Sequence, residues 1–243
     1  MEWTSRTSLL LGEENLNILR QSHVMVAGLG GVGSMLAEAL CRAGIGKLTL
    51  VDGDTIQPSN LNRQLLALNS NEGQLKADVM ALRLRDINPG IELDIHAEFL
   101  AGERIEELLS IPYSYVADAI DTLAPKLLFI RTCISHGHLL VSSMGTGGKL
   151  DPSMVRISQV EDSYGCRLAY IVRKKLHRMG IRNGFKVVFS PETVPEGAMV
   201  PVEEQNKKSR VGTISYMPPI FGCFMASVII RGLLDANKST PTL

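Results

Sequence analysis

The chain has 243 residues, of which 45% are apolar and 21% charged, and its 25 Lys and Arg residues balance 25 Asp and Glu residues. This length and composition fit one globular domain with a full core, and they exclude a disordered, collagen-like or coiled-coil protein. Zero net charge argues against a protein that binds nucleic acid over its whole surface, while a local basic patch remains compatible with it.

Strand and helix patterns alternate through the first part of the chain. Short apolar runs predict strands at 23–28, 47–52, 91–96, 115–120 and 138–143. Helical periodicity between them predicts helices at 31–44, 74–87 and 122–135. Strands that alternate with helices favour a parallel sheet that is covered on both faces and has right-handed crossovers.

The pattern changes after Asp151-Pro152. We predict a basic helix at 168–179, a strand at 186–189, a long loop at about 190–211 with three prolines, a strand at 212–216 and a helix at 220–234. The fold class is therefore α/β: a doubly wound, Rossmann-like mixed sheet, mostly parallel in its first half, with a C-terminal extension. We expect a single domain over 1–243.

The four cysteines are too few and too far apart for a disulfide framework or a four-cysteine zinc site. The N-terminus lacks the basic and apolar stretches of a signal peptide. The apolar run at 220–230 is shorter than the roughly 20 residues that span a bilayer. We therefore expect a cytoplasmic protein without a membrane span.

A glycine-rich turn, Gly28, Gly30, Gly31 and Gly33, follows the first strand and opens a helix. Glycines allow a tight turn and a close approach of phosphates to the helix N-terminus. Asp52 ends the next strand, where a carboxylate can accept hydrogen bonds from ribose hydroxyls. The pattern predicts a nucleotide site in the half of the chain at about 20–150, and by itself it fits ATP or a dinucleotide.

A second glycine segment, 145–149, resembles the end of a P-loop. Leu150 stands where a Ser or Thr would meet magnesium, and Ser143 replaces the first glycine of the motif. We interpret this segment as a tight turn after a strand.

Further motifs follow in a fixed order along the chain: Asp52-Gly-Asp54, the run SNLNRQ with Asn60 and Arg63, the pair Gly73 and Lys76, and Asp118-Ala-Ile-Asp121 with Lys126. Together they resemble the ubiquitin-activating-enzyme-like (ThiF/MoeB-type) adenylyltransferases over roughly residues 4–235. The resemblance implies a fold that binds ATP and Mg²⁺, adenylates a carboxylate and releases pyrophosphate.

The resemblance also implies roles for single residues. Arg63 and Lys76 contact the phosphates, and cations there suit the chemistry because the carboxylate and the triphosphate repel each other. Asn60 holds a phosphate or sugar oxygen. Asp121 is the magnesium-linked aspartate, which Asp54 assists. Arg6 matches an N-terminal arginine that reaches ATP from the partner subunit.

Within this family, the segments RTSLLLGEE, DAIDTLAPK, SSMGTGGKLDP and VVFSPE look like the tRNA threonylcarbamoyladenosine dehydratase branch. That likeness implies ATP-dependent cyclisation of threonylcarbamoyladenosine in tRNA through an acyl-adenylate. It also implies a homodimer, allows a monovalent cation (K⁺ or Na⁺), and allows cooperation with a cysteine desulfurase and sulfur-acceptor system.

The substrate distinguishes this branch from the activators of sulfur-carrier proteins, which adenylate a protein tail. Paired CxxC motifs, common in those activators, are absent from the chain. Positive charge gathers on and after the predicted basic helix, in the half at about 151–243, where it could follow a phosphate backbone: Arg173, Lys174, Lys175, Arg178, Arg182 and Lys186. Lys207, Lys208 and Arg210 could extend that surface, although a basic helix is commonly just solvated.

Three questions stay open. A nicotinamide-dependent oxidoreductase would fit the glycine turn and Asp52 but leaves Arg63, Lys76 and Asp121 without a task. A non-catalytic nucleotide sensor is disfavoured because the phosphate-site residues are present. Cys166 precedes the basic helix, and the dehydration chemistry does not require its thiol.

Overall fold

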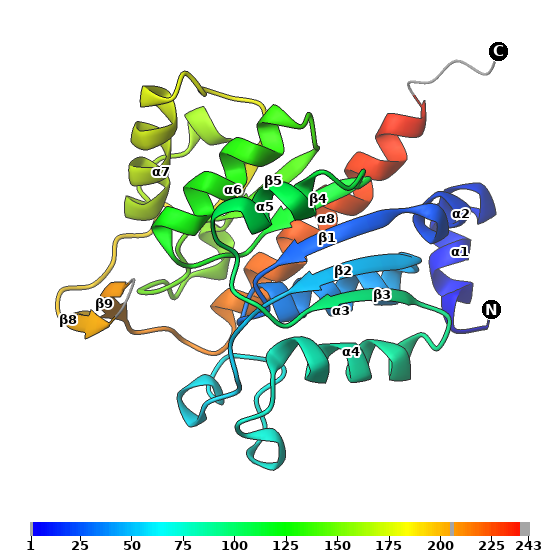
Figure 1. The fold of residues 1–243 in the computed structure, drawn as a ribbon, viewed down its shortest axis with the longest axis horizontal. Helices are drawn as coiled ribbons and strands as arrows, with labels where there is room; N and C mark the ends of the chain where they lie inside the picture. The colour runs from blue at the N-terminus through cyan, green and yellow to red at the C-terminus, as the bar shows by residue number, and fades with distance from the viewer. Residues whose placement is uncertain (1, 205–206, 239–243) are drawn as a thin grey trace.

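A seven-stranded sheet forms the centre of the computed structural model, which describes residues 2–204 and 207–238 (Figure 1). The strand order is β3-β2-β1-β4-β5-β7-β6, and all neighbours pair in parallel except β6 and β7. The strands are β1 (His23–Ala27), β2 (Lys47–Val51), β3 (Glu92–His96), β4 (Tyr115–Asp118), β5 (Leu140–Ser143), β6 (Arg156–Gln159) and β7 (Lys186–Phe189). The predicted doubly wound mixed sheet is confirmed.

Helices cover both faces of this sheet (Figure 1). One layer is formed by α2 (Glu13–Gln21), α3 (Gly33–Ala43), α4 (Lys76–Ile87) and α8 (Met217–Lys238). The other is formed by α5 (Gly102–Leu109), α6 (Leu123–Ser135) and α7 (Arg167–Arg178). A further helix, α1 (Ser5–Leu11), packs on α2.

The alternation of side chains along a strand produces two hydrophobic cores. In β1, Val24 and Val26 belong to the core on the α3 and α8 side, whereas Met25 and Ala27 belong to the core under α5 and α6. All four side chains are buried. A strand that is apolar on both faces is typical of a parallel sheet between two helical layers.

The last helix, α8, is longer than the sequence pattern predicted. Residues Met217–Ala236 are long and apolar enough, by length and composition alone, to cross a membrane, so the length argument against a span was wrong. However, Phe221, Met225 and Ile229 are fully buried in the core, and Gly222 lies so close to α3 that a Cβ would be 2.6 Å from the Val32 oxygen. We therefore interpret α8 as a core helix.

Two predictions for the C-terminal part were wrong. The expected loop at about 190–211 contains an antiparallel pair, β8 (Met199–Glu204) and β9 (Lys207–Val211). A two-stranded pair leaves one edge of each strand unpaired, so it tolerates Pro201. The expected strand at 212–216 is absent, because the Gly212 carbonyl accepts from Gly148 N–H rather than from a neighbouring strand.

The sequence reading also missed four elements: α1, α2, α5 and the edge strand β6. Short 3-10 turns, which were not predicted either, are Glu2–Thr4, Pro58–Asn60, Asn69–Asn71, Pro152–Met154 and Val160–Asp162. The other predicted elements are present, with ends shifted by a few residues, and β7 matches its predicted bounds.

Candidate active site

The carboxyl ends of β1, β2 and β4 meet at one edge of the sheet. β1 pairs with β2 on one side and with β4 on the other, so the chain order reverses at this point. Open α/β sheets bind ligands at such switch points. The glycine-rich turn follows β1, Asp52 follows β2, and Asp118 ends β4, so the topology brings three predicted motifs together.

The glycine turn is tightly packed, and the packing explains two of its glycines. Gly28 has a φ of +90°, and a Cβ on it would lie 2.8 Å from the Ala119 oxygen. A Cβ on Gly33 would lie 1.7 Å from the Gly28 oxygen. By contrast, a Cβ on Gly30 would come no closer than 3.8 Å to the side chain of Gln64. Gly30 is therefore not required by packing within this chain.

Asp52 anchors the glycine turn through its carboxylate. Its Oδ2 accepts from Leu29 N–H at 2.5 Å and its Oδ1 from Asp54 N–H at 2.8 Å. Burial raises the pKa of the Asp52 carboxyl, and Lys76 partly opposes that rise. Each carboxylate oxygen has a second lone pair, so the group can also accept from a ligand hydroxyl.

Lys76 begins α4 and its side chain is only 4% exposed. The ammonium lies 2.7 Å from Oδ2 of Asp54, whose side chain is 55% exposed. The same two residues are joined by a backbone bond from Lys76 N–H to the Asp54 oxygen at 3.0 Å. The structure therefore places a buried cation beside the Asp52 turn and pairs Asp54 with that cation.

Asn60 and Arg63 come from the turn after β2. The buried Asn60 closes this turn, because its Oδ1 accepts from Gln57 N–H at 3.1 Å and its backbone oxygen from Arg63 N–H at 3.1 Å. Arg63 Nη1 donates to the Ser59 oxygen and to Asn62 Oδ1, both at 2.8 Å. A Cβ on Gly31 would be 3.1 Å from the Arg63 oxygen, which places this turn against the glycine turn.

Gln64 is a further candidate site residue. It ends the SNLNRQ motif, in which only Asn60 and Arg63 were predicted to belong to the site. Its Oε1 is buried without a hydrogen-bond partner. Its Nε2 is the atom nearest to the Cβ position of Gly30. A buried amide oxygen without a partner is costly, which is a feature typical of functional sites.

The two aspartates at the end of β4 have different surroundings. Asp118 is fully buried and pairs with Lys126 at 2.8 Å. Asp121, three residues later, is exposed at the same edge of the sheet. The carboxylate predicted to serve a metal is thus the one that solvent and ligands can reach.

The second glycine segment does not form a phosphate loop. Lys149 is buried and its ammonium donates to the Glu192 backbone oxygen. The Glu192 carboxylate accepts from the N–H groups of Leu150 and Asp151, each at 2.9 Å. These contacts tie the turn to the segment after β7, as the tight-turn interpretation requires.

The predicted basic helix, α7, begins near the site and leads away from it. Leu168 lies 3.7 Å from the Cβ position of Gly145, which follows the carboxyl end of β5. The twelve residues of α7 span about 18 Å, from the carboxyl end of the sheet to its amino end. There the chain enters β7 at Lys186. Lys174, Lys175, Arg178, Arg182 and Lys186 are exposed.

Arg173 differs from its basic neighbours, because its Nη1 donates to the backbone oxygen and hydroxyl of Ser163, the latter at 2.7 Å. The side chains of Lys207, Lys208 and Arg210 lie outside the described residues. Arg6 is exposed on α1, which lies near the amino ends of β1 and β2, whereas the glycine turn follows the carboxyl end of β1 (Figure 1). Within one subunit, Arg6 does not belong to the site.

Four histidines and cysteines are used in packing or hydrogen bonds within the chain: Cys133, His136, His138 and Cys166. His136 Nε2 lies 2.7 Å from Glu106 Oε1, and His138 Nε2 lies 2.7 Å from the Leu109 oxygen. Cys133 and Cys166 are buried, and burial raises the pKa of the Cys133 thiol. The described part of the chain holds no group of three side chains suited to a metal ion.

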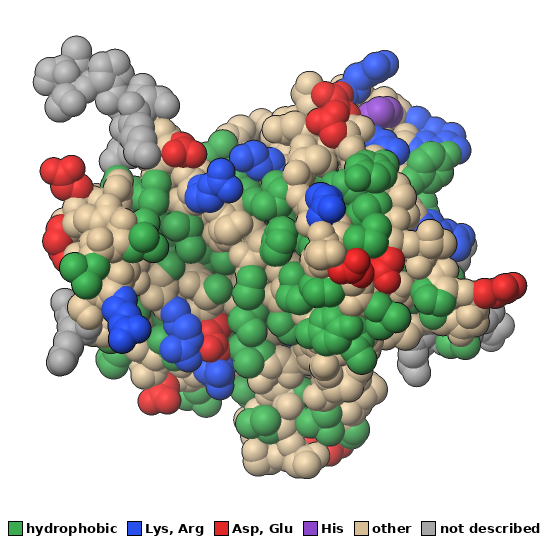
Figure 2. Space-filling model, turned by 180° about the vertical axis from the view of Figure 1, so that it is seen from behind, with side chains coloured by type: hydrophobic (Ala, Val, Ile, Leu, Met, Phe, Trp, Pro, Cys, Tyr) green, Lys and Arg blue, Asp and Glu red, His purple; other side chains and the backbone are tan. Residues whose placement is uncertain are grey.

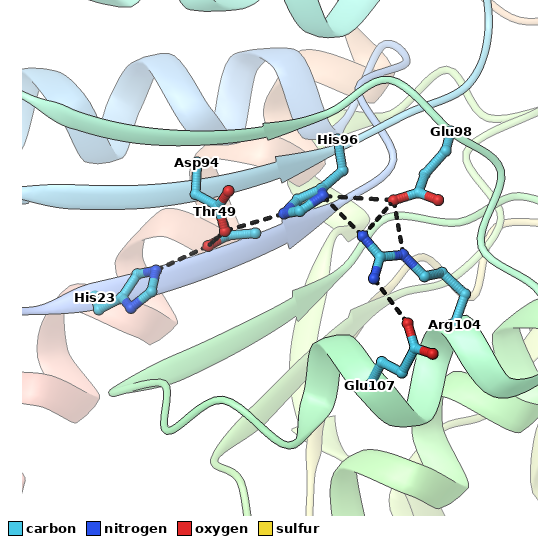
Figure 3. A network of polar contacts seen from close by, with 7 residues as sticks. All are labelled: His23, Thr49, Asp94, His96, Glu98, Arg104 and Glu107. Carbon is cyan, nitrogen blue, oxygen red and sulfur yellow. Dashed lines mark hydrogen bonds and ion pairs between the residues drawn. The ribbon is translucent and has the colours of Figure 1, made fainter.

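A polar network beside the site escaped the sequence reading (Figure 3). It joins the sheet to α5, where Arg104 donates to Glu98 at 2.9 Å and lies 3.2 Å from His96 Nδ1. The His96 backbone oxygen accepts from Asp52 N–H at 3.1 Å, so the network supports the Asp52 turn. Its members are His23, Thr49, Asp94, His96, Glu98, Arg104 and Glu107.

Comparisons with known proteins agree with this geometry. A sequence model described as the ThiF family matches residues 4–243. The chain is 37% identical over 238 residues to tRNA threonylcarbamoyladenosine dehydratase of Bacillus subtilis, covering 95% of this chain and 94% of that protein. It superposes on the crystal structure of the Escherichia coli dehydratase TcdA in complex with ATP with a TM-score of 0.90 and 32% identity, over 98% and 97% of the two chains.

A sulfur-transfer relative matches over a shorter stretch. Adenylyltransferase and sulfurtransferase uba4 of Aspergillus niger is 38% identical over 142 residues, which cover 58% of this chain and 29% of that protein. The similarity to the Bacillus subtilis dehydratase therefore covers nearly the whole chain, whereas the match to this sulfurtransferase covers little more than half of it.

Proposed function

The chain belongs to the ThiF family, and from this premise we propose that it is an ATP-dependent tRNA threonylcarbamoyladenosine dehydratase. The observation that carries the proposal is its similarity to such enzymes over nearly the whole chain, including one crystallised with ATP. The geometry supports it because Asp52 accepts from the glycine turn at the switch point, the Arg63 backbone packs against that turn, and Lys76 acts on the pKa of the Asp52 carboxyl. A nicotinamide oxidoreductase would give the two cations no task.

In the first step, a carboxylate oxygen of the threonyl group attacks the α-phosphorus of ATP. A P–O bond forms to the carboxylate, the bond to the β-phosphate breaks, and pyrophosphate leaves. The two reacting groups are anionic, so the buried ammonium of Lys76 and the guanidinium of Arg63 reduce their repulsion. Asp52 holds the ribose hydroxyls, Asn60 holds a phosphate or sugar oxygen, and the glycine turn holds the phosphates.

In the second step, an oxygen or nitrogen of the substrate's carbamoyl group attacks the activated carbonyl. The acyl C–O bond breaks, AMP leaves with the former carboxylate oxygen, and a proton is released. The net result is loss of one water from the nucleoside. Ring closure is intramolecular, so positioning supplies much of the rate and no enzyme nucleophile is needed. This agrees with a buried Cys166.

Mg²⁺ fits this site through the exposed carboxylate of Asp121, since Mg²⁺ is bound by one or two carboxylates together with substrate phosphates. When bound, the ion would neutralise phosphate charge. Asp54 would assist Asp121 as a second carboxylate, and its pairing with Lys76 leaves it a supporting role. A K⁺ or Na⁺ ion and cooperation with a cysteine desulfurase system remain part of the proposal, as does a cytoplasmic location.

The exposed cations of α7 are the proposed contact with tRNA. Lys174, Lys175 and Arg178 lie on the helix that leads away from the nucleotide site, so they would hold backbone phosphates at a distance from the reacting base. Arg182 and Lys186 extend this surface at the amino end of β7. Arg173 contributes less, because it is bonded to Ser163.

The proposed active form is a homodimer. Hydrophobic side chains gather across the middle of the rear face, the side on which α8 lies (Figure 2). On α1, Leu9 and Leu10 are 88% and 83% exposed, which is costly for apolar side chains unless a surface covers them. Arg6 lies on the same helix, so a second subunit is what could bring it to a nucleotide site.

An oxygen-transfer experiment tests the two-step chemistry. Substrate tRNA carrying ¹⁸O in the threonyl carboxylate is incubated with the protein, ATP and Mg²⁺, and the AMP is analysed by mass spectrometry. An acyl-adenylate predicts ¹⁸O in AMP in proportion to cyclised nucleoside. Cyclised nucleoside with unlabelled AMP would refute the acyl-adenylate. Pyrophosphate exchange that needs a carrier-protein tail instead of tRNA would support the sulfur-carrier alternative.

A further inference from the structure

A fully buried ion pair lies under the candidate site. Asp118 at the end of β4 and Lys126 on α6 are both 0% exposed, and Lys126 Nζ lies 2.8 Å from Asp118 Oδ2. Buried charges are tolerated only when additional hydrogen bonds satisfy them, and such a pair is weak evidence of a contribution to stability. The remaining bonds of the two groups therefore show what the pair is arranged to do.

The bonds of this pair converge on the short turn that follows β4. Asp118 Oδ1 accepts from Ile120 N–H at 3.0 Å, and Lys126 Nζ donates to the Ile120 oxygen at 3.0 Å. Ser142 on the neighbouring strand donates to Asp118 Oδ2 at 2.6 Å. The ammonium thus holds both ends of the turn, and the Ile120 carbonyl that it binds belongs to the peptide bond that leads into Asp121.

The turn after β4 also packs against the glycine turn. Ala119 N–H donates to the Ala27 oxygen at 2.8 Å. A Cβ on Gly28 would lie 2.8 Å from the Ala119 oxygen, and a Cβ on Gly33 would lie 3.2 Å from the Ala119 Cβ. The turn is therefore fixed between the phosphate-binding backbone and the buried Lys126, and Asp121 is the next residue to emerge at the surface.

We propose that Lys126 is a positioning residue for adenylation: by holding the Ile120 carbonyl, it sets where Asp121 stands relative to the glycine turn. This inference rests on the proposed function. Lys126 touches neither nucleotide nor substrate and acts through the backbone. A displacement of about 1 Å in a reacting constellation can lower a rate about a hundred-fold, which is the scale of the expected effect.

A double variant separates positioning from a structural role. Lys126→Met alone leaves an unpaired buried carboxylate, so it lowers stability as well as activity. Asp118→Asn with Lys126→Met removes both charges and relieves that defect, but it does not restore the bond to the Ile120 oxygen. The double variant should regain thermal stability, while tRNA-dependent ATP–pyrophosphate exchange should stay about a hundred-fold slower than in the unaltered protein. The loss should fall on kcat more than on the KM for ATP.

Ser142→Ala is the matched control, because it removes a bond to Asp118 that does not belong to the turn. It should lower stability and leave the exchange rate unchanged. Amide hydrogen exchange of residues 119–122 is the second readout: it should accelerate in Lys126→Met and in the double variant but not in Ser142→Ala. Amides of β2 serve as the internal reference, because a global loss of stability accelerates exchange there as well as in residues 119–122.

The proposal is overturned if the double variant recovers the exchange rate to within about three-fold of the unaltered protein. It is equally overturned if amides 119–122 keep their protection without Lys126. Failure of the proposed function gives a different result, because then the unaltered protein itself shows no tRNA-dependent exchange. In that case the hydrogen-exchange comparison still tests whether Lys126 holds the turn.

Discussion

Replacing Lys76 by Met should separate activity from stability. The ammonium is buried, but its partner Asp54 is 55% exposed and can be hydrated when the cation is removed. The lost pair should therefore cost about 0–1 kcal/mol of the free energy of unfolding, the range for exposed ion pairs, rather than the about 3–5 kcal/mol that follows when a buried charge loses its partner.

The expected loss of activity is larger. A preorganised group that stabilises charge in the transition state contributes about 3–4 kcal/mol, so adenylation should slow about 10²–10³-fold. ATP–pyrophosphate exchange measures this loss, and chemical denaturation measures stability. Lys47→Met is the matched control, since Lys47 also pairs with one carboxylate, Glu92, at 3.5 Å, but at the amino end of the sheet. Exchange within about three-fold of normal in Lys76→Met would refute the reasoning.

Three further predictions concern the nucleotide and tRNA sites. Gly30→Ala should keep its melting temperature but bind ATP more weakly by calorimetry, whereas Gly33→Ala should lose both, because Gly33 lacks space for a Cβ and Gly30 does not. Normal ATP affinity in Gly30→Ala would contradict the phosphate role. Because burial raises the pKa of Asp52 above its ordinary value of 3.8, the folded state gains a proton before the unfolded state does as pH falls, so Asp52 should add stability on acidification through that window. Denaturation measured against pH should show that Asp52→Asn lacks this gain in stability. The same pH profile in the variant and the unaltered protein would exclude a contribution from Asp52. Charge reversal at Lys174 and Lys175 should weaken tRNA binding in a filter assay and spare ATP binding, and unchanged tRNA affinity would remove α7 from the interface.

The sequence predicted the alternating strands and helices of the parallel part of the sheet. Strand β7 and the alternation from β1 to β5 carry apolar runs between glycines and prolines, so local pattern and tertiary packing agree there. The edge strand β6 has only four residues, two of them exposed, and no apolar run to mark it. The pair β8 and β9 contains Pro201 and many polar residues, which locally favour a loop.

The candidate site was predictable in its members but not in its internal pairing. Gly28, Asp52 and Lys76 follow from motif order, and parallel topology is enough to bring the first two together. The pairing of Lys76 with Asp54, and the burial of Asp118 against the exposure of Asp121, depend on how α4 and α6 pack against the sheet. Gln64 emerges only when hydrogen-bond partners are counted atom by atom.

The most direct test of the account is a nucleoside mass analysis. Purified protein is incubated with ATP, Mg²⁺ and tRNA that carries threonylcarbamoyladenosine, and the tRNA is digested under mild, neutral conditions. We expect a nucleoside lighter by one water, which forms only with ATP and is lost in Lys76→Met. An unchanged nucleoside, with intact substrate and a protein that binds ATP, would contradict the proposed activity.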